Sequence, residues 1–206
     1  MSTPHRTVSG FHACLSGLGS QQIGSAQRNI MTILGIDPSY HNTGWCIIES
    51  NEECFTVLKA GSIPVSLYRS KKRAKEYTEA QNISKIAFTI DFIILNQRCP
   101  LIDAVAIEKA PPVSRAGAGL LQQILGAIKA VVGQKLLDYK EFYPMTVKKL
   151  VTGFGGAEKI EVEKAIEEKL TERHEFRNYD ESDACAIAMA YWIDMKNDND
   201  GGRRSN

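Results

Sequence analysis

The feature that most constrains this chain is an apolar run, residues 34–37, that ends in a single aspartate, Asp37. A short turn containing proline, serine and glycine follows, and a second apolar run covers residues 45–48. Two apolar runs joined by a tight turn predict a β-hairpin with a carboxylate at its mouth. The functional question is therefore which other side chains the fold brings to Asp37.

The rest of the sequence alternates between strand and helix patterns. Further strands are predicted near residues 55–64, 104–107 and 141–143, and helices near 70–96, 120–132, 144–150, 157–170 and 181–194. This order favours an α/β domain whose mixed five-stranded sheet has three antiparallel strands, then parallel strands, with helices on its faces. Gly126 costs a helix about 1 kcal/mol relative to alanine, so we expect it to pack closely against a neighbouring backbone. Ile160 is expected on the inner face of its helix.

Composition bounds the class of protein. With 206 residues, of which 43% are hydrophobic and 24% charged, the chain suits one globular domain. We expect a flexible extension over residues 1–30, a domain over 31–196 and a flexible tail over 197–206. A net charge of +1 means that any polyanionic partner must be held by a local basic patch.

Neither a membrane nor a disulfide framework is expected. The apolar runs fall short of the roughly 20 residues that a bilayer-spanning helix needs. The five cysteines are scattered and contain no C-x-x-C pair, which favours reduced thiols in a cytoplasm, that of a bacterial cell or a phage-infected host.

Three more carboxylates stand at positions comparable to that of Asp37. Glu108 ends the short apolar strand 104–107, and Asp180 and Asp183 are three residues apart at a predicted helix start. Strand ends that meet at one edge of a sheet bring such side chains together. Four gathered carboxylates repel one another unless cations lie between them, and Mg²⁺ prefers oxygen ligands. Two such ions, about 4 Å apart, suit phosphodiester hydrolysis by a metal-activated water.

Each carboxylate also has a purely structural interpretation. Asp37 could shape a turn before proline, Glu108 could form a surface pair with Lys109, and Asp180 with Asp183 could cap the last helix. These alternatives stay open on position alone.

Four segments resemble, in order and spacing, the signature segments of the RuvC family of Holliday-junction resolvases. They are Gly35-Ile36-Asp37-Pro38 with Thr43-Gly44, Ala106-Ile107-Glu108, the segment 151–159 and the segment 180–188. The resemblance covers residues 31–191. It implies an RNase H-like fold, a homodimer, and nicking of four-way DNA junctions that resolves recombination or replication intermediates.

The resemblance also implies roles for individual residues. Asp37, Glu108, Asp180 and Asp183 would be the catalytic, metal-binding carboxylates, holding two Mg²⁺ ions with Mn²⁺ as a substitute. Lys159 matches a phosphate-contacting lysine of the family, although it could equally be an ordinary solvated lysine. Weaker DNA-binding candidates are Arg115, Lys148, Lys149 and Lys109, the last of which could instead offset the charge of Glu108.

The chain departs from the family pattern at two places. Ser39 stands where the family usually has glycine, and residues 110–112 are Ala-Pro-Pro where cellular members carry an aromatic residue. These differences fit a divergent, phage-type member.

Other functions remain open from the sequence. A nuclease that acts mainly on flaps or forks fits the same residues. The segment 35–39 also resembles the phosphate loop of actin-like ATP-binding proteins, but those need a second domain for which this chain is too short. A non-catalytic junction-binding module is less favoured, because a pure binder has no reason to gather negative charge where phosphates go.

Overall fold

The computed structural model describes residues 30–51, 54–65, 79–96, 101–110 and 118–202. Its elements are β1 (Ile30–Asp37), β2 (Asn42–Asn51), β3 (Cys54–Pro64), α1 (Glu79–Asn96), β4 (Ala104–Glu108), α2 (Ala118–Gln134), β5 (Asp138–Phe142), α3 (Pro144–Thr152), α4 (Lys159–Lys169) and α5 (Tyr179–Gly202). The strands form one sheet in the order β3-β2-β1-β4-β5. The pairs β1–β2 and β2–β3 are antiparallel, and β1–β4 and β4–β5 are parallel. The predicted mixed five-stranded sheet is confirmed.

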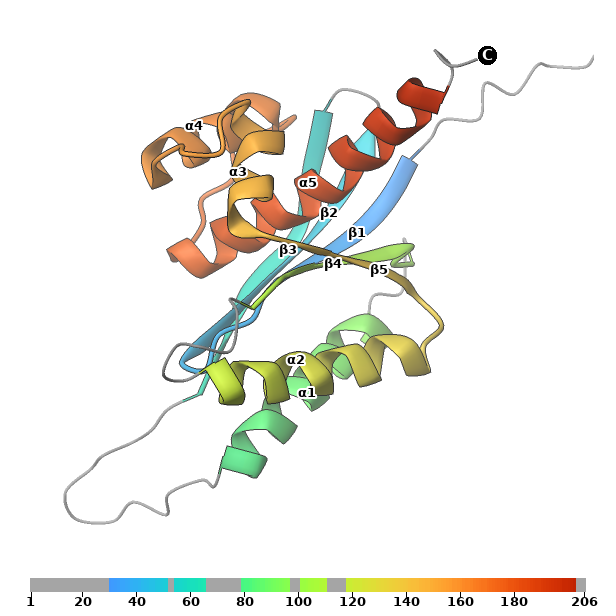
Figure 1. Cartoon of the computed structure of the whole chain (residues 1–206), viewed down its shortest axis with the longest axis vertical. Helices are drawn as coiled ribbons and strands as arrows, with labels where there is room; N and C mark the ends of the chain where they lie inside the picture. The colour runs from blue at the N-terminus through green and yellow to red at the C-terminus, as the bar shows by residue number, and fades with distance from the viewer. Residues whose placement is uncertain (1–29, 52–53, 66–78, 97–100, 111–117, 203–206) are drawn as a thin grey trace, which may run out of the picture.

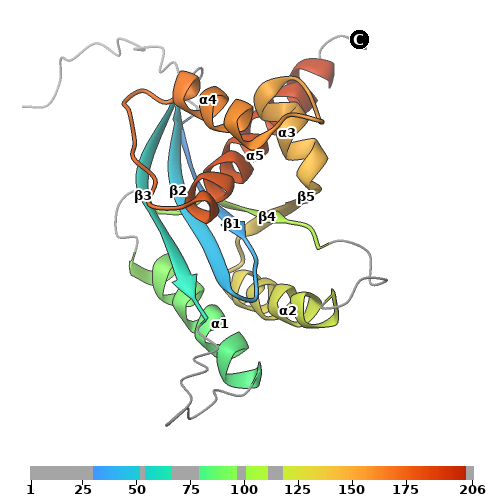
Figure 2. The ribbon, with the colours of Figure 1, turned by 90° about the vertical axis from the view of Figure 1, so that its left-hand side faces the viewer.

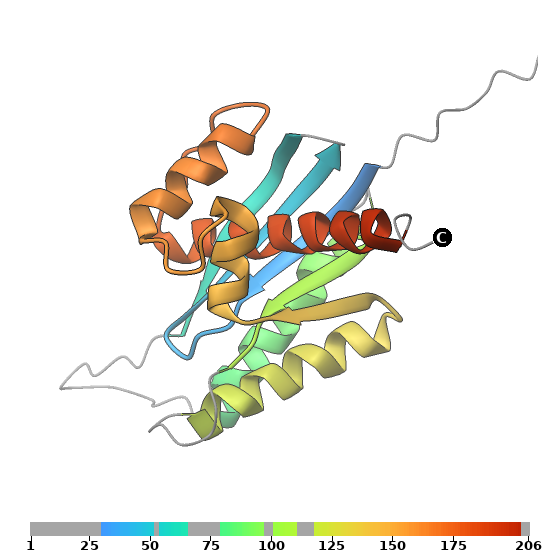
Figure 3. The ribbon, with the colours of Figure 1, turned by 45° about the horizontal axis from the view of Figure 1, so that its top comes forward.

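Helices cover both faces of this sheet. Figure 1 shows α1 and α2 on one side and α3, α4 and α5 on the other, and Figure 2 shows the same layers after a quarter turn. Two apolar cores result: Leu34 and Ile36 belong to the core under α1 and α2, whereas Ile33 belongs to the core under α5. Figure 3 shows α5 lying across the strands, with α3 and α4 beside it. None of the helices in the described ranges has the length and hydropathy needed to cross a bilayer.

The two-residue period of the strands decides which side chains face α5. Ile33 of β1 and Ala106 of β4 belong to the core on the α5 side, and the register pairs Gly35 with Ala106. Asp37 follows Gly35 by two positions, and Glu108 follows Ala106 by two positions. Because successive side chains alternate between faces, both carboxylates lie on the α5 side of the sheet. The strands β1 and β4 therefore deliver two carboxylates to one edge, under the start of α5.

Two packing expectations were wrong. Gly126 is exposed, and a Cβ added there would meet nothing within 4 Å among the described residues. Ile160 is 75% exposed, because α4 begins only at Lys159 and buries Val162 and Ile166 instead.

The last helix is longer than expected, continuing to Gly202 and beyond residue 196, where we placed the end of the domain. Lys140 of β5 forms ion pairs with Asp194 and, at 3.6 Å, with Asp198, which gives this part of α5 a partner in the sheet. Residues 1–29, the first part of the predicted helix 70–96 and the DNA-binding candidate Arg115 lie outside the described residues.

Candidate active site

Asp37 ends β1 beside a turn that other residues close. The Thr43 hydroxyl donates to the Ser39 carbonyl at 2.8 Å and accepts the Ser39 N–H at 3.2 Å. Thr43 is fully buried, so this small hydrogen-bonded ring is protected from water. The side chain of Asp37 makes no hydrogen bond within the described residues that would shape the turn. The turn-forming interpretation of Asp37 is therefore not supported, and its carboxylate is available to the site.

The start of α5 approaches the sheet through two glycines. A Cβ on Gly35 would lie 2.0 Å from the Ala184 carbonyl oxygen, and a Cβ on Gly44 would lie 2.0 Å from the Asp180 carbonyl oxygen. No real side chain tolerates such distances, so only glycine lets α5 lie this close to β1 and β2. This approach brings Asp180 and Asp183 to the edge where Asp37 and Glu108 end their strands.

The start of α5 is capped by Asn178 and not by the candidate ligands. Asn178 Oδ1 accepts the Glu181 N–H at 3.1 Å, and its amide donates to Ser62 Oγ at 3.1 Å. Glu181, only 2% exposed, accepts the Arg177 N–H at 3.0 Å and pairs with Arg177 Nε at 3.0 Å. Asn178, and not Asp180 or Asp183, therefore caps this helix. Glu181, whose role the sequence did not signal, fastens the loop before α5.

The carboxylates perturb one another strongly. Burial, and then the charges of Glu108, Asp183 and Asp180, raise the pKa of Asp37 to about 8. Burial, and then Asp183, raise the pKa of Glu108 to about 7. Burial also raises the pKa of Asp183. These influences indicate that the four side chains from β1, β4 and α5 lie near one another at this edge of the sheet.

Two neighbours already hold two of the carboxylates. Lys159 Nζ lies 3.4 Å from Asp183 Oδ2 and lowers the pKa of Asp37, Glu108 and Asp183. Asn42 Nδ2 donates a hydrogen bond to Asp180 Oδ2. Asn42 directly precedes the Thr43-Gly44 pair of the first motif, but nothing in the sequence indicates this contact with Asp180.

The remaining basic candidates differ in position. Lys148 donates to the Ala157 carbonyl at 2.6 Å and lowers the pKa of Glu108 and Asp183, so it lies near the site. Lys109 places its ammonium 4.6 Å from the ring centroid of Tyr143 and forms no ion pair with Glu108 within the described residues. Lys149 is exposed on α3.

The ligand set fits hard divalent cations in its chemistry, because all four candidates supply carboxylate oxygens. Within the described ranges, however, no three histidine, cysteine, aspartate or glutamate side chains are gathered tightly enough to form a ready metal site. Asp183 and Asp180 each have another partner, Lys159 and Asn42 respectively. We expect a modest side-chain rearrangement when cations bind.

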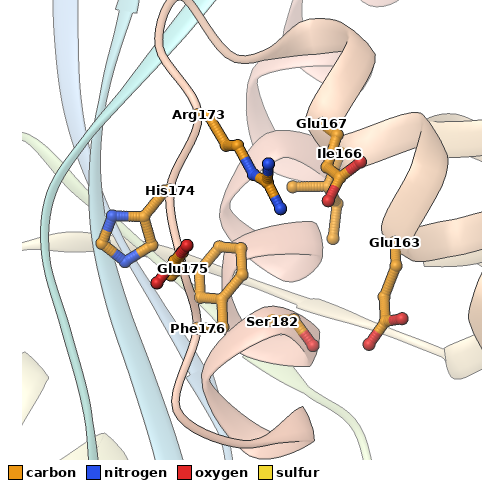
Figure 4. A pocket seen from close by; sticks show the side chains of 8 residues that line it. All are labelled: Glu163, Ile166, Glu167, Arg173, His174, Glu175, Phe176 and Ser182. Atoms are coloured by element: carbon orange, nitrogen blue, oxygen red, sulfur yellow. The ribbon is translucent and has the colours of Figure 1, made fainter.

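A separate cavity of about 360 Å³ lies between α4, the loop before α5 and α5 itself. Figure 4 shows Arg173 and His174 on the loop, with Glu163 and Glu167 on α4. None of the four candidate carboxylates lines it. Its lining mixes Arg173 and His174 with glutamates, and the cavity is distinct from the acidic edge.

The sheet topology and the acidic edge under α5 define an RNase H-like nuclease domain. A family model described as crossover junction endodeoxyribonuclease RuvC matches residues 33–191. The chain belongs to the RuvC family.

Relatives and solved structures agree with this assignment. The RuvC of Aliarcobacter butzleri is 31% identical over 162 residues, which cover 78% of this chain and 97% of that protein. The RuvC of Rickettsia massiliae is 33% identical over 159 residues, covering 77% and 94%. The fold matches that of Thermus thermophilus RuvC with a TM-score of 0.67 at 20% identity, covering 81% of this chain and 96% of that one. T. thermophilus RuvC in complex with a Holliday junction substrate gives 0.67 at 22% identity, covering 80% and 94%.

Proposed function

We propose that this protein is a metal-dependent endonuclease that nicks four-way DNA junctions, with Asp37, Glu108, Asp180 and Asp183 as the metal-binding residues. One observation carries the proposal: carboxylates from β1, β4 and α5 meet at one edge, where burial and then the neighbouring negative charges raise the pKa of Asp37 to about 8. Such a concentration of negative charge is costly to the fold without cations. Membership of the RuvC family supplies the substrate class and disfavours the ATP-binding alternative.

Mg²⁺ is the proposed ion, two per site, with Mn²⁺ as a substitute. Such ions would lower the pKa of an attacking water and stabilise charge on the leaving oxygen of the phosphodiester. For its own part, the chain must release the protons that Asp37 and Glu108 hold near neutral pH, since their pKa values are about 8 and about 7. Cation binding is therefore coupled to proton release.

Lys159 and Lys148 are the proposed phosphate-contacting residues. Both lower the pKa of Glu108 and Asp183, so their positive charges act on the site itself. The side chain of Lys159 is 61% exposed, so its ammonium can contact a phosphate from the solvent. Arg115, Lys109 and Lys149 remain further candidates for contact with the DNA arms.

We also propose that the enzyme acts as a homodimer in the cytoplasm. A junction has two strands to cut, so two copies of the site suit paired, symmetrical nicks. Phe88, Phe92 and Leu95 lie along one face of α1 and are 75%, 64% and 61% exposed. An apolar stripe of this kind supports a partner on α1, and we propose a second copy of the chain there. Light scattering of the purified protein tests the oligomeric state.

The experiment that tests the proposed function is cleavage of a substrate panel in Mg²⁺: a four-way junction, a fork, a flap and a linear duplex, each end-labelled on every strand. We expect paired nicks at symmetrical positions of the junction and little cutting of the duplex. Preferential cutting of the flap or fork would replace the proposed substrate with other branched DNA. Absence of cutting in all four would contradict the nuclease assignment.

A further inference from the structure

Several large apolar side chains in the part of the chain from α3 to α5 are exposed to solvent. They stand at the starts of α3, α4 and α5 and in the turn between α3 and α4: Tyr143 (51%), Met145 (71%), Phe154 (66%), Ile160 (75%) and Tyr179 (58%). Phosphate binding accounts for lysines at such a site, but it does not account for exposed apolar surface. Exposed apolar side chains next to candidate ligands point to a partner with apolar surface.

Tyr179 is tied directly to the carboxylate site. It is adjacent in sequence to Asp180, and the ammonium of Lys159 lies 4.9 Å from its ring centroid. The same ammonium is 3.4 Å from Asp183 Oδ2. The ring, the lysine and the carboxylate therefore form one continuous contact at the start of α5.

Tyr143 repeats this arrangement at another point of the edge. The ammonium of Lys109 lies 4.6 Å from its ring centroid, and the Lys109 N–H donates to the Phe142 carbonyl at 2.8 Å. Lys109 directly follows Glu108 in the sequence. A lysine–tyrosine pair thus adjoins each of two candidate carboxylates: Lys109 follows Glu108, Tyr179 precedes Asp180, and both tyrosines are more than half exposed.

We propose that Tyr143 and Tyr179 are stacking platforms for unpaired DNA bases next to the scissile phosphate. The inference rests on the proposed nuclease function and adds what the site recognises: a strand whose bases have left the duplex. Alternating aromatic rings and cations suit this ligand, because aromatic rings stack on bases of any sequence while lysines hold the intervening phosphates. A cation over a ring also restricts the ring and presents both groups together.

The test compares Tyr143→Ala and Tyr179→Ala with Tyr143→Phe and Tyr179→Phe, which keep the ring. Tyr139→Ala removes a tyrosine of β5 that is 44% exposed, and it serves as the matched control. The first measurement is binding of a fluorescent 12-nucleotide oligothymidylate in Ca²⁺. The second is the single-turnover cutting rate, in Mg²⁺, of a fully paired junction and of a junction with unpaired thymines at the crossing.

We expect each alanine variant to bind the oligonucleotide about 10-fold more weakly than wild type, whereas the phenylalanine and control variants stay within about 2-fold. We also expect the alanine variants to cut the fully paired junction more slowly, and the deficit to shrink on the pre-opened junction, where the bases are already unpaired.

Alanine variants that bind the oligonucleotide like wild type would overturn the inference. Phenylalanine variants that lose as much as the alanine variants would also overturn it, because the hydroxyl and not the ring would then matter. If the wild-type enzyme cuts the junction, either of these two results leaves the proposed nuclease function unaffected. Wild-type protein that cuts neither junction contradicts the proposed function, and the oligonucleotide binding still decides the stacking inference.

Discussion

The ammonium of Lys159 lies 3.4 Å from Asp183 Oδ2, at the point where α4 begins and α5 passes beneath it. Glu158 caps α4 in a reciprocal arrangement in which its N–H donates to Glu161 Oε2 at 2.7 Å. The position of Lys159 is therefore fixed by a helix start and not by a free loop. A cation held there lies between the carboxylates and any phosphate that approaches them.

Replacing Lys159 with glutamine should weaken junction binding and reduce the slope of log affinity against log salt by about 1, because one phosphate contact is lost. Fluorescence anisotropy with a labelled junction over a series of salt concentrations measures the slope. Lys164→Gln is the matched control on the same helix, since Lys164 is 76% exposed and, within the described part of the chain, its ion pair is with Glu168. An unchanged slope for Lys159→Gln would show that this lysine does not contact the DNA backbone.

The raised pKa values predict an unusual pH dependence of the metal-free protein. Asp37 has a pKa of about 8 when folded, against 3.8 ordinarily, and Glu108 about 7 against 4.5. The folded state therefore binds more protons than the unfolded state between these limits, and stability must fall as pH rises from about 4 to about 8. In EDTA, Asp37→Asn should flatten this fall.

Thermal unfolding at pH 5 and pH 8 measures the effect. At pH 8 without metal we expect Asp37→Asn to be more stable than wild type by at least 1 kcal/mol, or roughly 2–4 °C for a domain of this size. Added Mg²⁺ should stabilise wild type and reduce the difference. A variant less stable than wild type at pH 8 in EDTA would mean that the carboxylate is not repelled by its neighbours.

Gly44→Ala should damage the site through the backbone. The new Cβ would lie 2.0 Å from the Asp180 carbonyl oxygen, so α5 must move away from β2. We expect a loss of about 1–3 kcal/mol in the free energy of unfolding, together with loss of junction cutting. Gly126→Ala, at an exposed helical position with nothing within 4 Å, should instead stabilise by up to about 1 kcal/mol. Denaturant unfolding compares the two variants, and equal effects would contradict the close approach of α5.

Asn42→Ala should weaken cation binding without unfolding the protein. Its amide holds Asp180 Oδ2, and removing a group that orients a metal ligand typically costs about 10-fold or more in metal affinity. The midpoint of stabilisation in a Mg²⁺ titration, followed by thermal unfolding, measures this affinity. Asn51→Ala, at the exposed end of the same strand, is the control. An unchanged midpoint would show that Asp180 needs no support from Asn42.

The sequence predicted the features of the fold that depend on local residue patterns. Apolar strands that end in Asp37 and Glu108 fixed the sheet and the edge of the site, because side chains alternate between the two faces of a strand. Position alone could not separate the ligand interpretation of Asp180 from the capping one. The structure shows that Asn178 supplies the cap, whereas the ligand role of Asp180 stays a prediction.

Features that depend on tertiary contacts could not be predicted from the sequence. Asn42 acts through Asp180, which is distant in the sequence, so no local pattern marks it. Glu181 pairs with Arg177, four residues before it, but only the structure shows that Glu181 is buried. Gly126 and Ile160 were placed wrongly because helical spacing does not reveal which face another element covers. The last part of α5 pairs with Lys140, which is distant in the sequence and so gives no local signal.

The central claim is that four carboxylates hold the cations that drive junction cutting, and Asp37→Asn tests it most directly. The measurement pairs single-turnover cutting of a synthetic four-way junction in Mg²⁺ with binding of the same junction in Ca²⁺. We predict that cutting falls by about 100-fold or more, while junction affinity is retained. Cutting at the wild-type rate by Asp37→Asn would contradict the account.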